Sequence, residues 1–471
     1  MTTLNCFFHL MMILKLYSSL LLILFSYIQV KSLALESRFE TVETAPDQCK
    51  RHFIDPEDRA KSTFEVFHMN GPCSPTARTN RMNMQSAQDI LHRDRLRVEF
   101  LQARFKLNST TNKHDPRFQD TKEVAHLPVL ASSIGNYAIS TISLGTPQQM
   151  QTLVFDTGSD LTWTRGFHYY ASTSFHSIPC DSSLCTGYLP RHTCEMFDNK
   201  ENMCYYKRKY EDDSYSKGVF SKDILNITQT GDVFPNFLFG CATEIEGDFD
   251  ADGILGLERA PVSFVSQTKE IYRGIFSYCF PSSPSSTGFL KLGPRDYPHN
   301  VKFTPSMTNS NHPFFYFINI TSIKVAGVEL LVNKLDLMFP GTIIDSGAAI
   351  THLHMNVYKT MRNEFLKHVG IYGFQTVESP FQTFDTCYYN SKYLRKIVPI
   401  ITFTFVGGVT VEMDDSGTLY ETDDLKIACF AFAGNSDAGN LAVFGTTQQM
   451  RFEVVYDVYR EKLGFIPHGC L

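Results

Sequence analysis

Residues Leu153 to Ser159 read LVFDTGS, an apolar run that ends in a carboxylate followed by two hydroxyl residues around a glycine. Residues Ile343 to Gly347 repeat the pattern as IIDSG, with the second Asp 189 positions after the first. Each run predicts a buried strand that enters a tight turn, where the glycine adopts a conformation that a Cβ would resist. We expect the two turns to meet, which would bring Asp156 and Asp345 together.

Such a pair of carboxyl groups can act as acid and base at the same pH. Carboxyl groups about 3 Å apart cannot both ionise, so they share one proton. The ionised group takes a proton from a bound water, and the protonated group donates to a scissile carbonyl as a tetrahedral intermediate forms. We therefore predict amide hydrolysis with Asp156 and Asp345 as catalytic residues, without a metal or another cofactor.

Other catalytic chemistries have weaker signals in this chain. A serine hydrolase is a weaker alternative, because Ser and His are plentiful but no Gly-x-Ser-x-Gly motif is present. His168 and His176 lie near several cysteines, but their spacing does not match a zinc site.

Composition indicates a large globular protein that is mostly β structure. The chain has 471 residues, of which 43% are hydrophobic and 20% charged, enough for more than one domain. Its 39 Phe and 22 Tyr fall in aromatic or β-branched runs separated by Gly, Pro, Ser and Asn, which favours strands. The net charge of −6 argues against nucleic acid as a partner.

The first part of the chain differs from the rest. Residues 1–32 contain an apolar stretch and predict a secretory signal peptide that is cleaved near Ser32 to Ala34. A membrane anchor is the alternative, but the uninterrupted apolar run after Lys15 is short for a span. Residues 33–125 are highly charged and poor in alternating strands.

A helical pattern begins near Ser86 inside this charged segment. Four apolar residues fall on one face of it, and most basic residues fall elsewhere. The apolar residues are Leu91, Val98, Leu101 and Phe105, and the basic ones are Arg93, Arg95, Arg97, Arg104 and Lys106. From the residues alone, a solvated linker helix is the simplest interpretation.

The second part of the chain contains an internal repeat. The motifs DGILGL and AVFG contain Gly256 and Gly445, which lie 100 residues after Asp156 and Asp345 respectively. Equal spacing of two composite motifs indicates a duplication.

These motifs together resemble those of pepsin-type aspartic proteases, most of all the plant nepenthesin-like branch. The phrase LGTPQQ at residues 144–149 and the segment 448–465 are also typical of this family. The resemblance covers nearly everything after residue 32. It implies an all-β, bilobal fold of two similar lobes resembling six-stranded barrels, with a cleft between them. The lobes would span residues 126–300 and 301–471, and residues 33–125 would be a propeptide whose basic residues cover the acidic cleft until low pH weakens the pairing.

The resemblance also implies roles for individual residues. Asp156 and Asp345 would form the dyad, and a shared proton is an established property of such dyads. Tyr210 would lie at the tip of the flap, a hairpin that closes over substrate and excludes water, with Trp163 behind it. The residues that support the dyad would be Thr157, Gly158, Ser159, Ser346 and Gly347.

The 12 cysteines suggest disulfides formed in an oxidising compartment. The resemblance implies the pairs Cys180 with Cys204, Cys185 with Cys194, Cys279 with Cys470, and Cys387 with Cys429. The resemblance gives Cys241 no disulfide partner, because residues 164–170 lack the three Cys that the family usually carries there. We expect a free or buried thiol at Cys241.

Sequons at Asn226 and Asn319 are candidate glycosylation sites if they are exposed. With the signal peptide and the disulfides, they predict a protein that is secreted or in a vacuolar lumen. We expect a monomer that acts on protein or peptide substrates and has no stable membrane anchor.

Four substitutions depart from the family pattern. Ala348 occupies the place of Ser159 in the second loop, so one hydrogen bond to ionised Asp345 is missing, which should raise the apparent pKa of the dyad. Glu211 and Asp213 replace glycines near the predicted flap tip and should stiffen it and repel acidic substrates. Thr447 replaces a common Asn.

We therefore predict a secreted aspartic endopeptidase, made as a zymogen and active at acidic pH. The alternative is a proteolytically silent relative, such as the plant inhibitors that use this fold to bind cell-wall glycosidases. Those inhibitors typically lack a dyad Asp, whereas this chain has both Asp156 and Asp345.

Overall fold

The computed structural model describes most of the chain after residue 48, within one compact unit, Cys49–Leu471. The described residues are 49–50, 63–69, 71–75, 87–110, 137–189, 192–209, 215–247, 249, 251–281, 283, 285–298, 301–422, 426–437 and 439–470. The predicted signal peptide and Tyr210, Glu211 and Asp213 of the predicted flap lie outside them. Within these ranges, no helix has the length and apolar character needed to cross a bilayer.

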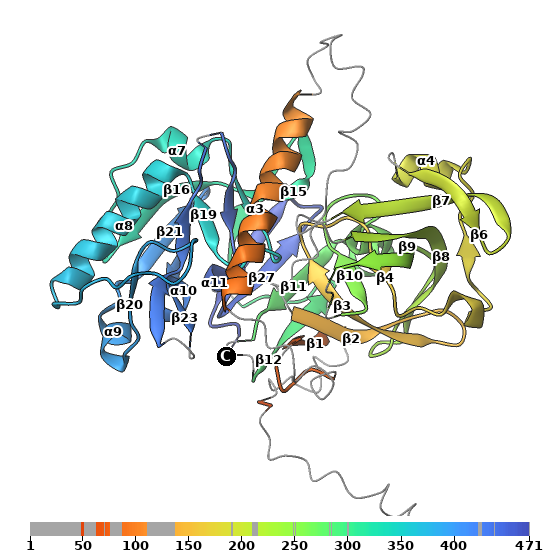
Figure 1. Ribbon diagram of the computed structural model, residues 1–471, viewed down its shortest axis with the longest axis horizontal. Helices are drawn as coiled ribbons and strands as arrows, with labels where there is room; N and C mark the ends of the chain where they lie inside the picture. Colours follow the sequence, from red (N-terminus) through yellow and green to blue (C-terminus); the bar gives the residue numbers. More distant parts are fainter. Residues whose placement is uncertain are drawn as a thin grey trace, which may run out of the picture. The chain divides into compact units, whose positions relative to one another are not determined.

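Strands dominate the fold, which confirms the predicted all-β class (Figure 1). The largest sheet has 15 strands in the order β13-β28-β27-β11-β12-β1-β2-β3-β10-β4-β9-β8-β7-β6, with β5 paired to β8. They are β1 (Thr63–His68), β2 (Tyr137–Leu144), β3 (Gln149–Asp156), β4 (Trp163–Thr164), β5 (His176–Ser177), β6 (Thr193–Phe197), β7 (Lys200–Lys209), β8 (Tyr215–Ile227), β9 (Asp232–Glu246), β10 (Gly253–Gly256), β11 (Ile275–Cys279), β12 (Thr287–Leu292), β13 (Lys302–Pro305), β27 (Phe452–Asp457) and β28 (Lys462–Pro467).

The second half of the chain builds three smaller sheets. Their strand orders are β14-β15-β18-β26-β19-β25, β17-β16-β21-β22 and β20-β24-β23. The strands are β14 (Met307–Asn309), β15 (His312–Ile318), β16 (Ile320–Val325), β17 (Val328–Glu329), β18 (Thr342–Ile344), β19 (Thr351–Leu353), β20 (Cys387–Tyr389), β21 (Ile401–Phe405), β22 (Val409–Met413), β23 (Leu419–Thr422), β24 (Ile427–Phe430), β25 (Phe432–Gly434) and β26 (Ala442–Phe444).

The predicted duplication is visible in the strand pairing. Strand β3 runs parallel to β10, with Gly256 opposite Asp156, and β18 runs parallel to β26 in the same way. The N–H of Gly256 donates to Thr162 Oγ1 at 3.2 Å, and that of Gly445 donates to Thr351 Oγ1 at 3.1 Å. A Cβ at either glycine would lie 2.4 Å or less from a backbone oxygen. Only glycine allows these positions to pack this closely against the loop that follows each Asp.

Most helices are short and connect the strands. They are α4 (Ser183–Tyr188), α5 (Phe264–Gln267), α6 (Lys269–Tyr272), α7 (Lys334–Met338), α8 (Met355–Gly370), α9 (Lys392–Ile397), α10 (Asp415–Thr418), α11 (Thr446–Gln449) and the 3-10 turn Tyr169–Ala171. Helix α8 buries Val357, Met361 and Phe365, which share one face at helical spacing.

The helix predicted from Ser86 is present as α3 (Ala87–Thr110), which lies between strands of the two halves in Figure 1. Its four predicted apolar residues are buried or partly buried. Two of the five basic residues also turn inward, because the side chain of Arg97 is fully buried and that of Arg104 is only 17% exposed. A second difference is β1, a strand in a segment predicted to be poor in strands, where Phe64 and Val66 are fully buried.

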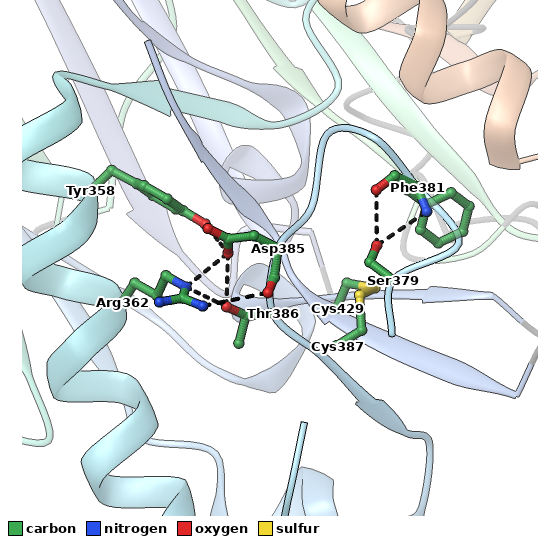
Figure 2. The surroundings of a disulfide bond; sticks show 8 residues. All are labelled: Tyr358, Arg362, Ser379, Phe381, Asp385, Thr386, Cys387 and Cys429. Carbon is green, nitrogen blue, oxygen red and sulfur yellow. Dashed lines mark hydrogen bonds and ion pairs between the residues drawn. A yellow bond between two sulfur atoms is a disulfide. The ribbon is translucent and has the colours of Figure 1, made fainter. Parts of the chain in front are cut away.

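Two predicted disulfides are confirmed, Cys279–Cys470 and Cys387–Cys429. Figure 2 shows the second of these, which joins β20 to β24. Beside it, Asp385 accepts hydrogen bonds from Tyr358 Oη at 2.5 Å and Arg362 Nε at 2.8 Å, which tie this region to α8. A further disulfide, Cys49–Cys73, was not predicted.

The predicted pairs Cys180–Cys204 and Cys185–Cys194 are wrong, because the structure joins Cys180 to Cys194 and Cys185 to Cys204. Cys194 and Cys204 face each other across the β6–β7 hairpin, so all four cysteines lie close together and their sequence spacing does not decide the pairing. Helix α4 buries Cys185 in an apolar cluster that also contains Cys180 and Cys204, so shared burial does not select one pairing either. His192 lies within 4.8 Å of Cys180 and Cys194, but their disulfide leaves no thiolate for a metal.

Cys241 is a buried free cysteine, as predicted. It lies in β9 opposite Thr164 of β4, where the chain offers a hydroxyl instead of a sulfur. Aromatic rings pack in this region. The rings of Phe167 and Phe239 meet edge to face, with 5.5 Å between their centroids. Burial raises the pKa of the Cys241 thiol to about 12, so it stays protonated and unreactive at neutral pH.

A thiol titration checks this arrangement. We expect a chain that lacks residues 1–34, and therefore Cys6, to react with a thiol reagent at one site, and only after denaturation without reduction. Cys241→Ser should abolish that reaction. Two or more reactive thiols in the denatured chain, or one in the native chain, would contradict it.

Candidate active site

Asp156 and Asp345 lie at the ends of two buried parallel strand pairs. Asp156 is the last residue of β3, and Asp345 directly follows β18. Both carboxylates are almost completely buried. Each loop brings its glycine against the carboxylate of the other, because a Cβ on Gly158 would lie 2.8 Å from Asp345 Oδ1, and one on Gly347 would lie 3.1 Å from Asp156 Oδ1. The two carboxyl groups therefore face one shared space.

The two loops are joined by a reciprocal pair of hydrogen bonds. The N–H of Thr157 donates to Ser346 Oγ at 2.9 Å, and the N–H of Ser346 donates to Thr157 Oγ1 at 2.9 Å. All four groups are buried, so each would carry a desolvation cost if its partner were lost. These bonds hold the carboxylates at a fixed separation.

The immediate surroundings of the two carboxylates differ. Asp156 accepts the N–H of Gly158 at 2.9 Å and the hydroxyl of Ser159. Asp345 accepts the N–H of Gly347 at 3.2 Å, but Ala348 offers no hydroxyl. The ionised form of Asp345 therefore has less support from its own loop.

The guanidinium of Arg97, from α3, lies between the two carboxylates. Its Nε is 2.9 Å from Asp345 Oδ2, and its Nη1 is 3.1 Å from Asp156 Oδ2. Its Nη2 is 2.8 Å from the Oδ1 of both. A single cation thus donates to all four carboxylate oxygens and offsets part of the negative charge of the pair.

Burial and charge act in opposite directions on these groups. Burial raises the pKa of Asp345 above its usual value, while the charge of Arg97 lowers it and that of Asp156 raises it again. Burial alone would lower the pKa of Arg97. The charges of the two carboxylates outweigh burial, so the pKa of Arg97 lies above its usual value. Arg97 therefore stays charged at every accessible pH.

Asp94 holds the first half of α3 against the loop that follows Asp345. Its Oδ1 accepts the N–H of Ala349 at 2.7 Å, and its Oδ2 lies 2.8 Å from His352 Nε2. Asp94 and His352 are both buried. This contact fixes α3 three residues before Arg97.

Two residues in the second half of α3 hold it beyond Arg97. The amide of Gln102 donates to the carbonyl of Leu441 at 2.7 Å and accepts its N–H at 2.6 Å, so a side chain completes the backbone hydrogen bonds just before β26. The guanidinium of Arg104 donates to Glu258 at 2.5 and 3.0 Å. The helix therefore occupies the space next to both carboxylates along several turns.

The described structure places the remaining predicted residues as follows. Trp163 is buried in an apolar cluster that also contains Val98 and Leu101 of α3, and Tyr210 is outside the described residues. Asn226 is only 7% exposed within β8, so it does not meet the exposure condition for glycosylation, and Asn319 is partly buried.

Gln449 is a supporting residue that the sequence did not indicate. Its Nε2 donates to the carbonyls of Asp345 at 3.1 Å and Phe444 at 2.8 Å, and its Oε1 accepts the hydroxyl of Tyr278 at 2.5 Å. It thereby connects the Asp345 loop to both β26 and β11. An amide in a helix of four residues carries no pattern that predicts such a role.

Comparison with protein families matches both halves of the chain. Residues 137–294 match the family described as "Xylanase inhibitor N-terminal", and residues 315–467 match "Xylanase inhibitor C-terminal". Among solved structures, the crystal structure of edgp has a TM-score of 0.60 at 21% identity, covering 70% of this chain and 91% of that one. Soybean basic 7S globulin has a TM-score of 0.57 at 19% identity, covering 70% and 92%. These likenesses concern the fold.

Closer relatives are named as proteases. An aspartyl protease family protein of Arabidopsis thaliana is 36% identical over 430 residues, covering 87% of this chain and 88% of that protein. Aspartyl protease AED1 of the same plant is 34% identical over 426 residues, covering 87% of each. Aspartic proteinase nepenthesin-2 of Nepenthes gracilis is 29% identical over 367 residues, covering 73% and 80%. Together with the paired Asp loops, these relatives show that the chain belongs to the plant pepsin-type aspartic protease family.

Proposed function

We propose that this protein is an aspartic endopeptidase, in which Asp156 and Asp345 share a proton and activate a water molecule for attack on a peptide bond. The observation that carries the proposal is that the two carboxylates meet in one buried space, held by the Thr157 and Ser346 hydrogen bonds. In the helix-bound state Arg97 occupies the position where water and substrate would bind. The substrates would be proteins or peptides, in a secreted or vacuolar setting.

The helix α3 would be the inhibitory part of a propeptide within residues 33–125. It would block both carboxylates, because Arg97 fills the space between them where a catalytic water would bind. Burial raises the pKa of Asp345, while the charge and hydrogen bonds of Arg97 favour its ionised form, so protonation of Asp345 would weaken its contact with Arg97. By linkage, the affinity of the helix falls as the pH falls. Because burial raises the pKa of Asp345 above that of an ordinary Asp, this loss would begin at a milder acidity.

A catalytically silent binding protein is the second candidate. The observation that favours it is that both matching family descriptions refer to xylanase inhibitors. Against it, both Asp residues are present and each has hydrogen-bond donors from its own loop.

Substitution of the dyad tests the proposal directly. After α3 has been released at acidic pH, we expect the chain to hydrolyse a denatured protein. Pepstatin should block this hydrolysis. Asp156→Asn and Asp345→Asn should each reduce the rate by on the order of 10³-fold or more, because neither leaves a shared proton. The exposed Asp181→Asn is the control. Unchanged hydrolysis in both dyad variants would refute the mechanism, and xylanase binding without any hydrolysis would support the second candidate.

Replacement of Arg97 tests the inhibitory role of α3. Arg97→Gln removes the cation that balances the dyad, so we expect the uncut chain to begin hydrolysing a short peptide at a pH higher by roughly one unit or more. Arg95→Gln is a matched control, because Arg95 lies on the exposed side of the same helix and contacts Gln382. An identical onset pH for Arg97→Gln and the unaltered chain would contradict this role.

A hydroxyl at position 348 tests the asymmetry of the dyad. Ala348→Ser would supply the hydrogen bond that Ser159 gives Asp156, and would lower the pKa of Asp345 by stabilising its ionised form. We expect the pH profile of the matured enzyme to move by roughly one unit toward acid. Ser159→Ala should move it the other way. A profile that moves in neither variant would exclude this explanation.

A further inference from the structure

Glu258 is a buried carboxylate beside the dyad that the mechanism above does not use. It follows β10 by two residues, and its N–H donates to the carbonyl of Ser159 at 3.0 Å. The preceding residue, Leu257, donates its N–H to the carbonyl of Asp156 at 2.9 Å. The backbone of Glu258 is therefore fixed to the loop that carries Asp156, and its side chain is completely buried under α3.

The group that fills the space in front of Glu258 is an arginine side chain. The two terminal nitrogens of Arg104 contact the two oxygens of Glu258, in the bidentate geometry that suits guanidinium and carboxylate. Nη1 of Arg104 also donates to the carbonyl of Gly158 at 3.2 Å. Its guanidinium carbon lies 4.6 Å from the centre of the Phe315 ring, a cation–π contact. The Glu258 carboxylate, the Gly158 carbonyl and the Phe315 ring therefore each make a contact that suits a guanidinium.

This arginine belongs to α3 and would leave with it. Glu258 would then lose the cation that lowers its pKa, while burial and the charges of Asp160 and Asp156 raise that pKa. The Glu258 carboxylate would then have lost its bidentate partner, and another guanidinium could take the same place. Lysine would fit less well, because it lacks the planar fork that pairs with both oxygens.

We propose that Glu258, the Gly158 carbonyl and the Phe315 ring form a subsite for an arginine side chain of the substrate, an inference that rests on the proposed function. Arg104 lies seven residues after Arg97, which is about 10 Å along a helix. An extended peptide covers that distance in about three residues. The preferred substrates are therefore peptides with an arginine about three residues from the bond that is cut.

Peptides that differ only in charge test the subsite. The enzyme is matured from the folded full-length chain, through a protease site inserted in residues 112–136. Each peptide carries either arginine or citrulline, and citrulline has nearly the same shape without the charge. In different peptides this residue stands two, three or four positions before or after the scissile bond. We expect kcat/KM to favour arginine by about 10–100-fold at one position, mostly through KM, as the loss of one hydrogen-bonded charge pair implies.

Variants then locate the preference. Glu258→Gln should bring the arginine-to-citrulline ratio close to one. Asp437→Asn is the matched control, because Asp437 pairs with Lys106 of the same helix but lies at an exposed position. It should keep the ratio of the unaltered enzyme. A ratio that persists in Glu258→Gln, or that falls equally in Asp437→Asn, would overturn the assignment to Glu258.

The outcomes for the subsite and for the proposed function are separable. Pepstatin-sensitive hydrolysis with equal rates for arginine and citrulline peptides in the unaltered enzyme would overturn the subsite alone, and needs no variant to fold. Absence of hydrolysis for every peptide would overturn the proposed function. In that case, calorimetric binding of the same peptides to the matured chain decides the subsite, with tighter binding of the arginine peptide expected and equal binding contradicting it.

Discussion

Two carboxylates buried side by side repel each other, and the central part of this structure depends on how that repulsion is balanced. In the state described, the balance comes from one guanidinium that reaches all four oxygens of Asp156 and Asp345. The loops cannot relieve the repulsion by moving apart, because Thr157 and Ser346 bind each other's backbone. Once the guanidinium is removed, a proton is the remaining group small enough to take its place. Under the function proposed above, inhibition and catalysis would use the same constraint.

Helix α3 contacts the cleft with side chains where a substrate would use its backbone. Gln102 satisfies both backbone groups of Leu441, as a neighbouring strand would, and Arg97 occupies the dyad. The carbonyls of a helix are engaged in its own hydrogen bonds, so none is offered for attack. As part of the proposed propeptide, α3 would therefore fill the site without presenting a bond to cut. The side chains of α3 therefore indicate which chemical groups the surface beneath the helix could bind.

The duplicated halves share their central strands but not their details. In both halves a glycine strand lies against the Asp strand and donates to a threonine hydroxyl. The immediate support of each carboxylate differs, since Ser159 has Ala348 as its counterpart. Such asymmetry separates the acid–base properties of two otherwise equivalent groups. Gln449 adds a link from the Asp345 loop to Tyr278 of the other half.

By itself, the sequence determined the all-β class, the two Asp loops, their duplication and the apolar face of α3, because these depend on local periodicity and on glycines at fixed spacing. It did not determine the pairing of Cys180, Cys185, Cys194 and Cys204, since four cysteines that lie in one region allow several pairings and only the tertiary structure selects one. Nor did it indicate which basic residue meets the dyad. Arg97 and Arg104 were two among five, and only the tertiary structure decided their partners, because a buried charge is stable only where folding brings an opposite charge to it.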